Sequence, residues 1–541
     1  MPHGLRAAGY RLTVSREYDA VVVGAGPNGL VAANHLVDRG WSVLVLEAQP
    51  DVGGAVASDR ELHPDFVHDT FSAFYPLAAV SRALQGFGLE AHGLRWAHAP
   101  AVLGHPLPQG EWAMLHRDRE VTAGLLDAQH PGDGEAWLAL CADWDRIGDA
   151  VVGALLTPFP PVRPALAALP RLRSVGGLRF VRELLTPAAD LGRHRFGGEA
   201  ARILLAGNAG HADIPLTAPG SGLMALLLTM LGQTVGFPAP VGGAGMLAHA
   251  LAGRLRLAGA DLHCASEVTA IEVAGGRAVA VRTVTGERYA ARHAVVADVS
   301  ATSLYGRLLP ADTLPRRTRE AMRAFEMDPG TVKVDWALSG PVPWGSAPPY
   351  APGTVHVADS VEDVAEALHQ VGSRRIPAAP FLLAGQMTTT DPTRSPAGTE
   401  SMWAYAHVPQ HTARDAGDGT IRGVWDAADC ERFADRMQAR IERRAPGFGE
   451  RVLARRVLGP RELEARDANL VGGGLNGGTA QLHQQLVFRP VPGLGRAETP
   501  VRGLYLGSAA AHPGGGVHGA PGTNAARAAV AHRRARFLVR R

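Results

Sequence analysis

The sequence predicts an α/β fold in which a doubly wound, Rossmann-type domain is intertwined with a mixed-sheet domain that carries a helical cap. Three observations lead to this prediction. A strand, a glycine loop, a helix and a second strand follow one another between Tyr18 and Glu47. A second glycine-rich loop enters a helix near the C-terminus, and a stretch with helical spacing lies between the two, at residues 133–205. The length of 541 residues is enough for about two to four domains.

The first unit has the pattern of a dinucleotide-binding βαβ motif. It consists of a strand at Asp19–Val23, a loop at 24–29, a helix at Leu30–Arg39 and a strand at Ser42–Leu46. Gly24 permits the tight turn, Gly26 lets the backbone approach a pyrophosphate, and Gly29 lets the helix and strand pack closely. The helix N-terminus then offers free N–H groups to the phosphates. Glu47 ends the second strand, where its carboxylate can accept hydrogen bonds from ribose hydroxyls.

The middle of the chain alternates between helices and strands. Prolines divide the Leu-, Ala- and Arg-rich residues 133–205 into short helices. No Asp, Glu, Lys or Arg occurs between Asp213 and Arg254, but the only unbroken apolar part, Leu223–Leu231, is shorter than the roughly 20 residues that cross a bilayer. We expect a buried helix there that lines a pocket. Further strands are expected at Val268–Val273, Ala278–Val284, Ala294–Ala297 and Thr331–Leu338, the first two joined by a turn at 274–277.

The C-terminal part contains a second loop suited to a long cofactor. A buried strand at Val501–Leu506 precedes a glycine-rich loop at 507–519, and we expect Asn524 to cap a helix that starts at Ala525. A cofactor whose two ends are held by opposite ends of the chain needs two such loops. The sequence has no second unit of strand, GxGxxG, helix and acid-tipped strand, so a dedicated NAD(P)H domain is not expected.

Composition argues against several classes of protein. The 54 basic and 51 acidic residues leave a formal charge of +3, too small to indicate nucleic-acid binding through a strong electrostatic footprint. Cys141, Cys264 and Cys430 are widely spaced, which argues against a disulfide framework and a structural zinc site, and no metal is expected. Residues 1–17 lack the continuous apolar stretch of a secretory signal, so the expected location is the cytoplasm.

Several motifs resemble those of a known group of flavoproteins. GAGPNGL, LEA and the Gly53–Gly54 pair, all within residues 21–58, look like the FAD-binding signature of glutathione-reductase-type and amine-oxidase-type flavoproteins. Five further segments resemble the phytoene-desaturase-like family, and the last of them is most similar to its carotenoid-ketolase-like branch. These segments are PVGGAGMLAHAL (240–251), SEVTAI (266–271), DPTRSPAGTESMWAYAHVP (391–409), NLVGGGLNGGTAQLHQ (469–484) and LYLGSAAAHPGGGVHGAPGTNAA (504–526). The resemblance covers nearly the whole chain after Tyr18.

The resemblance implies FAD as the cofactor. It places the first glycine loop at the pyrophosphate, Glu47 at the adenosine ribose and Val268 beside the adenine. Ser508 stands beside the ribityl chain, where relatives commonly have an acid, and residues 516–519 lie beneath the flavin pyrimidine, where N–H groups stabilise negative charge. The residues expected to contact FAD are Gly24, Gly26, Pro27, Asn28, Gly29, Glu47, Ala48, Gly53, Gly54, Ala55, Val268, Gly507, Ser508, Gly516, Val517, His518, Gly519 and Asn524.

The resemblance also implies a domain division and a reaction. We expect the FAD-binding domain at residues 18–105, 240–305 and 466–541, and the substrate domain with its helical cap at 106–239 and 306–465. The implied activity is removal of a hydride, and so two electrons, from a largely apolar substrate such as a polyene or other hydrophobic metabolite onto flavin N5. Oxygen or a quinone is the expected acceptor. Two alternatives stay open: an amine- or amino-acid-type flavin oxidase of specialised metabolism, and a non-catalytic FAD-binding protein. The oligomeric state is left open.

Lys333, His518 and His211 are the candidate catalytic residues. In amine-oxidase-type flavoproteins a lysine on a strand like that around Lys333 holds a water at flavin N5. Its spacing from Gly330 is one residue short, however, and a one-residue slip turns a side chain to the opposite face. His518 adjoins the C-terminal glycine loop. His211 either looks into the substrate cavity or is hydrogen-bonded in the core.

Two further patterns each allow a functional and a structural interpretation. Trp336 and the alternating residues Trp403, Tyr405 and His407 fit either the wall of a substrate pocket or ordinary sheet packing. Arginines alternate with Leu and Phe over residues 163–182. This pattern fits either peripheral contact with an anionic membrane that supplies a lipid-like substrate, or solvated helix faces.

Overall fold

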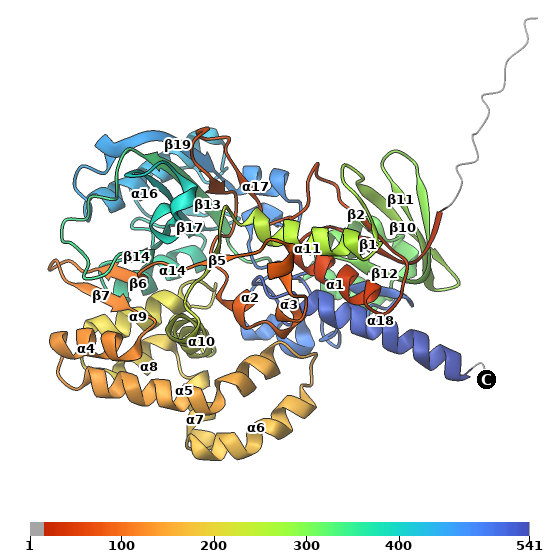
Figure 1. Cartoon of the computed structure of the whole chain (residues 1–541), viewed down its shortest axis with the longest axis horizontal. Helices are drawn as coiled ribbons and strands as arrows, with labels where there is room; N and C mark the ends of the chain where they lie inside the picture. The colour runs from red at the N-terminus through yellow and green to blue at the C-terminus, as the bar shows by residue number, and fades with distance from the viewer. Residues whose placement is uncertain (1–15, 540–541) are drawn as a thin grey trace, which may run out of the picture.

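Two seven-stranded sheets organise the chain, whose computed structural model describes residues 16–539 (Figure 1). The mixed α/β architecture confirms the predicted fold class. The two sheets lie at opposite ends of the long axis of the molecule, and the helices of the cap lie along the lower edge of the second sheet. The expectation about a secretory signal falls, except for Arg16 and Glu17, outside the described residues.

The first sheet contains the predicted βαβ unit at its centre. Strand β1 (Arg16–Val23) pairs in parallel with β2 (Val43–Leu46) on one side and with β12 (Arg288–Ala297) on the other. The remaining strands are β9 (Asp261–His263) beside β2, the antiparallel pair β10 (Val268–Ala274) and β11 (Arg277–Thr283) beyond β12, and β20 (Leu504–Leu506), parallel to β12. Segments from the start, middle and end of the chain therefore share one sheet.

Both faces of this sheet are covered, which explains why its strands are almost continuously apolar. On one face, Val22, Val45 and Val296 pack in one cluster with residues of three helices. These helices are α1 (Pro27–Val37), α11 (Gly245–Leu257) and α18 (Ala520–Val539). On the other face, the alternate residues of the same strands pack against the β10–β11 hairpin and residues 304–309.

The second sheet runs in the order β19-β13-β17-β16-β14-β6-β7. Its strands are β6 (Ala101–Pro106), β7 (Trp112–Leu115), β13 (Gly330–Leu338), β14 (Pro352–Val357), β16 (Leu382–Gln386), β17 (Glu400–Val408) and β19 (Val452–Leu458). Helix α16 (Ala427–Glu442) packs its apolar residues against one face. Strand β6, which belongs to the second sheet, begins at Ala101 and so crosses the domain boundary expected at residue 105.

The cap consists of seven helices, and the predicted helical character of residues 133–205 is confirmed. They are α4 (Arg119–Gln129), α5 (Asp133–Leu155), α6 (Val162–Ser174), α7 (Leu178–Leu185), α8 (Ala188–Arg195), α9 (Glu199–Ala209) and α10 (Ser221–Thr234). Helix α10 is the buried helix expected around Leu223–Leu231, extended at both ends. No helix within residues 16–539 combines the length and apolar character needed to span a bilayer.

A buried cluster of charges joins the two sheets. Arg394 is fully buried and donates 2.9 Å hydrogen bonds to the carboxylates of Asp69 and Asp391. It also donates to the Pro240 carbonyl at 3.1 Å, next to the start of α11. Because a buried cation is stable only when its donors are paired, this arginine fixes three distant segments relative to one another.

The prediction that Asn524 caps the last helix is wrong. Helix α18 begins at Ala520, and the Thr523 N–H already donates to the Gly519 carbonyl at 3.0 Å. Pro521 explains the earlier start, because the φ that its ring fixes is favourable in the first turn of a helix. Asn524 therefore lies inside α18.

Candidate active site

The first glycine loop has no room for side chains. Gly24 has φ +98°, and a Cβ there would lie 2.6 Å from the Asp298 carbonyl oxygen. A Cβ on Gly29 would lie 2.2 Å from the Gly24 carbonyl oxygen, and one on Gly26 would lie 2.9 Å from Asp298 Oδ2. The loop therefore turns tightly between β1 and α1 and keeps its backbone open to a ligand, as the spacing of its glycines predicts.

Asp298 is a residue of this loop's surroundings that the sequence analysis missed. It follows β12 directly, and its Oδ2 accepts a 2.7 Å hydrogen bond from the Gly29 N–H. Burial raises the pKa of Asp298 to about 8, and the Gly29 hydrogen bond opposes this shift only in part. Asp298 is therefore largely protonated near neutral pH and adds little negative charge beside a bound phosphate. Its position at the tip of a predicted parallel strand was the signal that could have identified it.

Glu47 lies at the tip of β2, as predicted, and supports the same loop. Its two carboxylate oxygens accept hydrogen bonds from the Ala25 N–H at 2.6 Å and the Gln49 N–H at 2.8 Å. Burial raises the pKa of Glu47, while these backbone donors lower it. Burial likewise raises the pKa of Asp467 to about 6, and Asp467 Oδ2 would lie 3.3 Å from a Cβ on Gly54. Buried carboxyl groups thus surround the glycine loop.

The C-terminal glycine loop lies against the first one. A Cβ on Gly522 would lie 1.9 Å from the Asn28 carbonyl oxygen, and one on Gly519 would lie 2.7 Å from Val31. Gly54, in the segment after Glu47, also approaches the first loop, because a Cβ there would lie 3.3 Å from the Gly26 Cα. The loops expected to hold the two ends of one cofactor are therefore neighbours in space.

The residues present fit a dinucleotide at this junction. The Oδ1 of Asn28, in the first turn of α1, is buried and lacks a hydrogen-bond partner within the described chain. The N–H groups of Gly26 and Asn28 are also unused by the hydrogen bonds found among residues 16–539. The unused N–H groups at the helix N-terminus are typical of an anion site, whereas the Asn28 Oδ1 is suited to accept a hydrogen bond from a hydroxyl of the dinucleotide. The other expected contacts stay predictions: Pro27 starts α1, Ala48 follows Glu47, Val268 starts β10, and Gly507 and Ser508 follow β20.

An apolar cavity of about 300 Å³ opens beside these loops. Ala55 lines it from the N-terminal part, and Gly515, Gly516 and Val517 line it from the C-terminal loop. Most of the remaining lining is hydrophobic: Phe71, Phe74, Tyr75, Leu77, Met224, Leu228, Phe237, Trp403, Tyr405, Leu463, Leu470 and Leu475. A largely apolar cavity with a few polar groups is the usual form of a small-molecule site.

Lys333 lines this cavity from β13. The slip in register considered above does not turn its side chain away. Its Nζ donates to the Asp69 carbonyl at 2.9 Å and to the Asp335 carboxylate, and lies 6.0 Å from the centre of the Trp403 ring. Burial lowers the pKa of Lys333, and the Asp335 carboxylate opposes the shift. The site therefore contains one buried amine with a carboxylate partner.

His211 lines the same cavity and begins a chain of three histidines. Its Nε2 lies 3.0 Å from His356 Nε2, and His356 Nδ1 lies 3.1 Å from His105 Nε2. Gly207 makes room for these histidines, since a Cβ there would lie 2.5 Å from His105 Nε2 and from His356 Nδ1. Burial lowers the pKa of His211 and of His105 to about 3, so both rings are neutral near pH 7.

His518 and the predicted aromatic wall are only partly associated with the cavity. His518 is not among the residues that line it. Its Nδ1 accepts a 3.1 Å hydrogen bond from the Ala520 N–H at the start of α18, and burial lowers its pKa to about 4. Trp403 and Tyr405 line the cavity, whereas His407 lines a separate pocket and Trp336 packs against Phe448.

We predict that the raised pKa of Asp298 makes stability depend on pH. The folded state holds the Asp298 proton more tightly than the unfolded state does. The stabilisation that this proton gives the folded state is therefore complete below about pH 4 and is lost as the pH rises through about 8. Asp298→Asn keeps the acceptor for Gly29 and removes the titration. When the pH rises from 5 to 9, the free energy of unfolding, measured by urea denaturation, should fall less for the variant than for the parent chain, by about 1 kcal/mol or more.

The exposed carboxyl of Asp312 provides the control. Asp312→Asn should follow the parent chain at both pH values. Equal losses for the parent chain and Asp298→Asn would contradict the assignment of a protonated Asp298.

Comparison with known proteins supports the assignment from geometry. Residues 28–336 match the family described as flavin containing amine oxidoreductase. The chain is 30% identical to mouse (Mus musculus) pyridine nucleotide-disulfide oxidoreductase domain-containing protein 2, over 94% of this chain and 93% of that protein. It is 24% identical to the neurosporene-forming phytoene desaturase of Rhodobacter capsulatus, over 92% of this chain and 91% of the desaturase.

Solved structures show the same fold. Cyclohexylamine oxidase from Brevibacterium oxydans superposes with a TM-score of 0.56 at 17% identity, covering 96% of this chain and 99% of the oxidase. The family match favours an enzyme over a non-catalytic FAD-binding protein. It also agrees with the two glycine loops that meet beside the apolar cavity. This chain belongs to the flavin containing amine oxidoreductase family and is an FAD-dependent oxidoreductase.

Proposed function

We propose that the substrate is a largely apolar, uncharged molecule, such as a polyene or another hydrophobic metabolite, which loses two electrons as a hydride. The observation that carries this proposal is the lining of the apolar cavity, which contains no carboxylate among the described residues. An ammonium group buried there would lack a counter-ion and would lie near the buried amine of Lys333. A hydrocarbon meets no such penalty and gains from burial of its apolar surface.

The side chains of the cavity have separate proposed roles. The aromatic and aliphatic walls bind the substrate and exclude water, which strengthens the electrostatic effect of the few polar groups. FAD, when bound, supplies the two-electron acceptor. Lys333 orients a water or a polar substituent through Nζ, which Asp69 and Asp335 hold in place. His211, which is neutral, provides a hydrogen-bonding nitrogen in the cavity wall, and His518 fixes the start of α18.

Oxygen or a quinone is the proposed final electron acceptor. This proposal rests on the sequence, which contains one dinucleotide-binding unit with an acid-tipped second strand and no second one for a nicotinamide nucleotide. The phytoene desaturase relative supports the proposal of an apolar substrate, since its name refers to a polyene.

An amine substrate is the second candidate. Trp403 and Tyr405 lie nearly parallel, with ring centres 6.1 Å apart and an interplanar angle of 17°. Aromatic faces attract cations, and the structural neighbour named cyclohexylamine oxidase is an amine oxidase. The absence of a carboxylate from the described lining is the reason for ranking this candidate second.

Replacement of Gly26 should abolish cofactor binding. In Gly26→Leu the side chain would enter the space beside Asp298 Oδ2, 2.9 Å from the new Cβ, and block the approach of the phosphates. The purified variant should therefore lack the visible absorption of flavin. Gly253→Leu, on α11 with nothing within 4 Å of the new Cβ, should retain it. A Gly26→Leu protein with a full complement of flavin would refute the phosphate assignment.

The substrate class can be tested by bleaching of the flavin absorption without oxygen. Polyenes and cyclic alkenes should bleach it, while primary amines of similar size should not, because the cavity offers apolar contact and no anionic partner. Hydrogen peroxide release in air then tests oxygen as the acceptor. Bleaching by amines alone would establish the second candidate and overturn the proposal of an apolar substrate.

We also propose that α6 and α7 contact an anionic phospholipid membrane. Val162, Leu166 and Leu169 on α6 and Leu178 and Leu185 on α7 are all exposed, Leu178 to 83%. Residues 162–185 contain five arginines and a single acid, Glu183. Exposed apolar side chains interleaved with arginine are typical of helices that lie in a membrane interface.

Vesicle flotation tests this surface. The protein should float with vesicles containing phosphatidylglycerol, and Leu178→Asp should lower the bound fraction about tenfold, because an anion replaces an inserted side chain. Leu257→Asp on α11 is the matched control, since Leu257 is 81% exposed and lies outside α6 and α7. Equal effects of the two substitutions, or equal binding to neutral vesicles, would contradict the proposal.

A further inference from the structure

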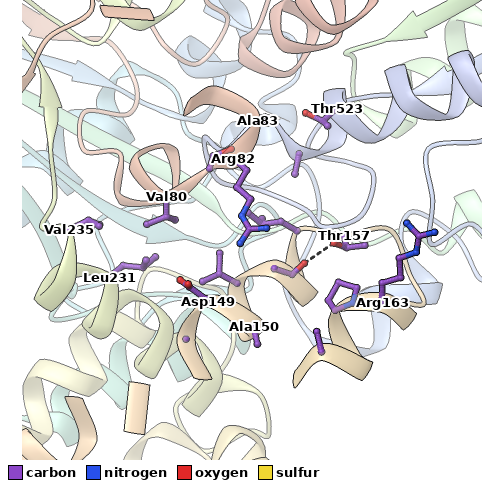
Figure 2. A pocket seen from close by; sticks show the side chains of 18 of the residues that line it. Val80, Arg82, Ala83, Asp149, Ala150, Thr157, Arg163, Leu231, Val235 and Thr523 are labelled. Atoms are coloured by element: carbon purple, nitrogen blue, oxygen red, sulfur yellow. Dashed lines mark hydrogen bonds between the residues drawn. The ribbon is translucent and has the colours of Figure 1, made fainter. Parts of the chain in front are cut away.

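A second and larger cavity lies outside the candidate active site. It has a volume of about 700 Å³ and is enclosed by α5, α6, the end of α10, α18 and the short helices α2 (Pro76–Val80) and α3 (Arg82–Gln85). Within residues 16–539, no residue lines both this cavity and the apolar cavity. Figure 2 shows Arg82 extending toward the middle of this space, with Val80, Leu231 and Val235 on one side and Thr157 and Arg163 on the other.

One part of the lining is hydrocarbon. Val80 of α2, Val152 and Leu156 near the end of α5, and Leu231 and Val235 at the end of α10 contribute aliphatic side chains. Covering this surface with an alkyl chain lowers the free energy of the complex, because apolar area is removed from water.

The remaining part is rich in arginine. Arg82, Arg163, Arg171 and Arg527 line the cavity, and none of their guanidinium groups makes a hydrogen bond or an ion pair with the rest of residues 16–539. Of the two carboxylates in the lining, Asp145 is already paired with Arg119 at 2.6 Å, which leaves Asp149. Four exposed arginines therefore line the cavity, and described carboxylates neutralise little of their charge.

A buried amide adds a donor to these cations. Asn524, one of the residues expected to contact FAD, lines this cavity from α18 and does not line the apolar cavity. It is 5% exposed, and its Nδ2 is buried without a hydrogen-bond partner among the described residues. Buried donors are normally satisfied, and a rotation of this unpaired amide would present it to a hydrogen-bond acceptor in the cavity. Arg527 lies one helical turn further along α18.

We propose that this arginine-lined cavity binds a single-chain amphiphilic anion. Its carboxylate or phosphate monoester head group accepts hydrogen bonds from Asn524 and the arginines, since guanidinium groups match both anions well. Its alkyl chain lies along the aliphatic wall formed by α2, α5 and α10. A free inorganic anion would leave that wall uncovered, and a neutral hydrocarbon would gain nothing from the positive charge of the exposed arginines. The proposal concerns a second site and does not depend on the identity of the oxidised substrate.

The position of the site relates it to the apolar cavity. Met224 and Leu228 of α10 line the apolar cavity, whereas Leu231 and Val235, one to two turns further on, line the arginine-lined cavity. On α2, Leu77 likewise lines the apolar cavity and Val80 lines the arginine-lined cavity. A chain bound in the second cavity thus rests on residues of the same helices that wall the first.

Calorimetric titration of the purified flavoprotein tests the proposal. The probes are decanoate, decyl phosphate, decanol and inorganic phosphate, each below the concentration at which it forms micelles. Decanoate or decyl phosphate should bind at one site per chain, at least about tenfold more tightly than decanol, and inorganic phosphate should not bind measurably. The carboxylate and the phosphate monoester thereby distinguish the two possible head groups. Tighter binding of decanol, or saturable binding of inorganic phosphate alone, would overturn the proposal.

Two pairs of variants assign the binding to this cavity. Gly153 lines it, and a Cβ there meets nothing within 4 Å, so Gly153→Leu fills the space without disturbing α5. Gly124→Leu on α4 is the control, since its Cβ also meets nothing and it lines neither cavity. Gly153→Leu should weaken binding of the anionic probe about tenfold or more, and Gly124→Leu should leave it unchanged.

The second pair tests the arginines. The double substitution Arg82→Gln and Arg527→Gln should weaken decanoate but not decanol, whereas Arg256→Gln on α11, also exposed, should affect neither. Equal loss of both probes would show that charge is not recognised. Binding that survives Gly153→Leu would place the anion elsewhere, in the apolar cavity or on the surface. These titrations involve no turnover, so their failure is distinguishable from failure of the proposed oxidation.

Discussion

The packing of α1 against α18 is the contact on which the cofactor site depends. Two glycines of the C-terminal segment approach α1 so closely that a Cβ on Gly522 would lie 1.9 Å from the Asn28 carbonyl oxygen, and one on Gly519 would lie 2.7 Å from Val31. Two helices can meet at this distance only where side chains are absent. The same contact places both glycine loops at one end of the first sheet, where the parallel strands end in Glu47 and Asp298.

Charge is distributed unevenly around this contact. Buried carboxyl groups surround the first loop, and burial raises the pKa of Asp298 to about 8, so that it does not act as a full negative charge there. None of the described residues that line the apolar cavity has a carboxylate, whereas four arginines line the second cavity. Helices α2 and α10 separate these last two environments. Residues of the same two helices therefore line both the apolar cavity and the arginine-lined cavity.

The sequence predicted those features that follow from local pattern. The βαβ unit, the hairpin at β10 and β11, the buried α10 and the glycine loops all have a period or a turn signal that a single segment carries. Features that depend on contacts between distant segments could not be predicted from the sequence. Asn524 looked like a helix cap, but Pro521 allows α18 to start earlier. His518 stays a predicted flavin contact, and the hydrogen bond that its Nδ1 accepts from the Ala520 N–H could not be foreseen from the sequence. Asp298 and the arginine-lined cavity become visible only once the strands and helices are assembled.

The contact between the two glycine loops has a consequence for biosynthesis. The loop at residues 516–519 is synthesised long after the loop at residues 24–29. Domains that fold as the nascent chain emerges do so from the N-terminus, yet here the surface of α1 that meets Gly519 and Gly522 stays uncovered until those residues have left the ribosome. The nucleotide can therefore be enclosed only once both loops are available, and until then an apolar helix stays exposed.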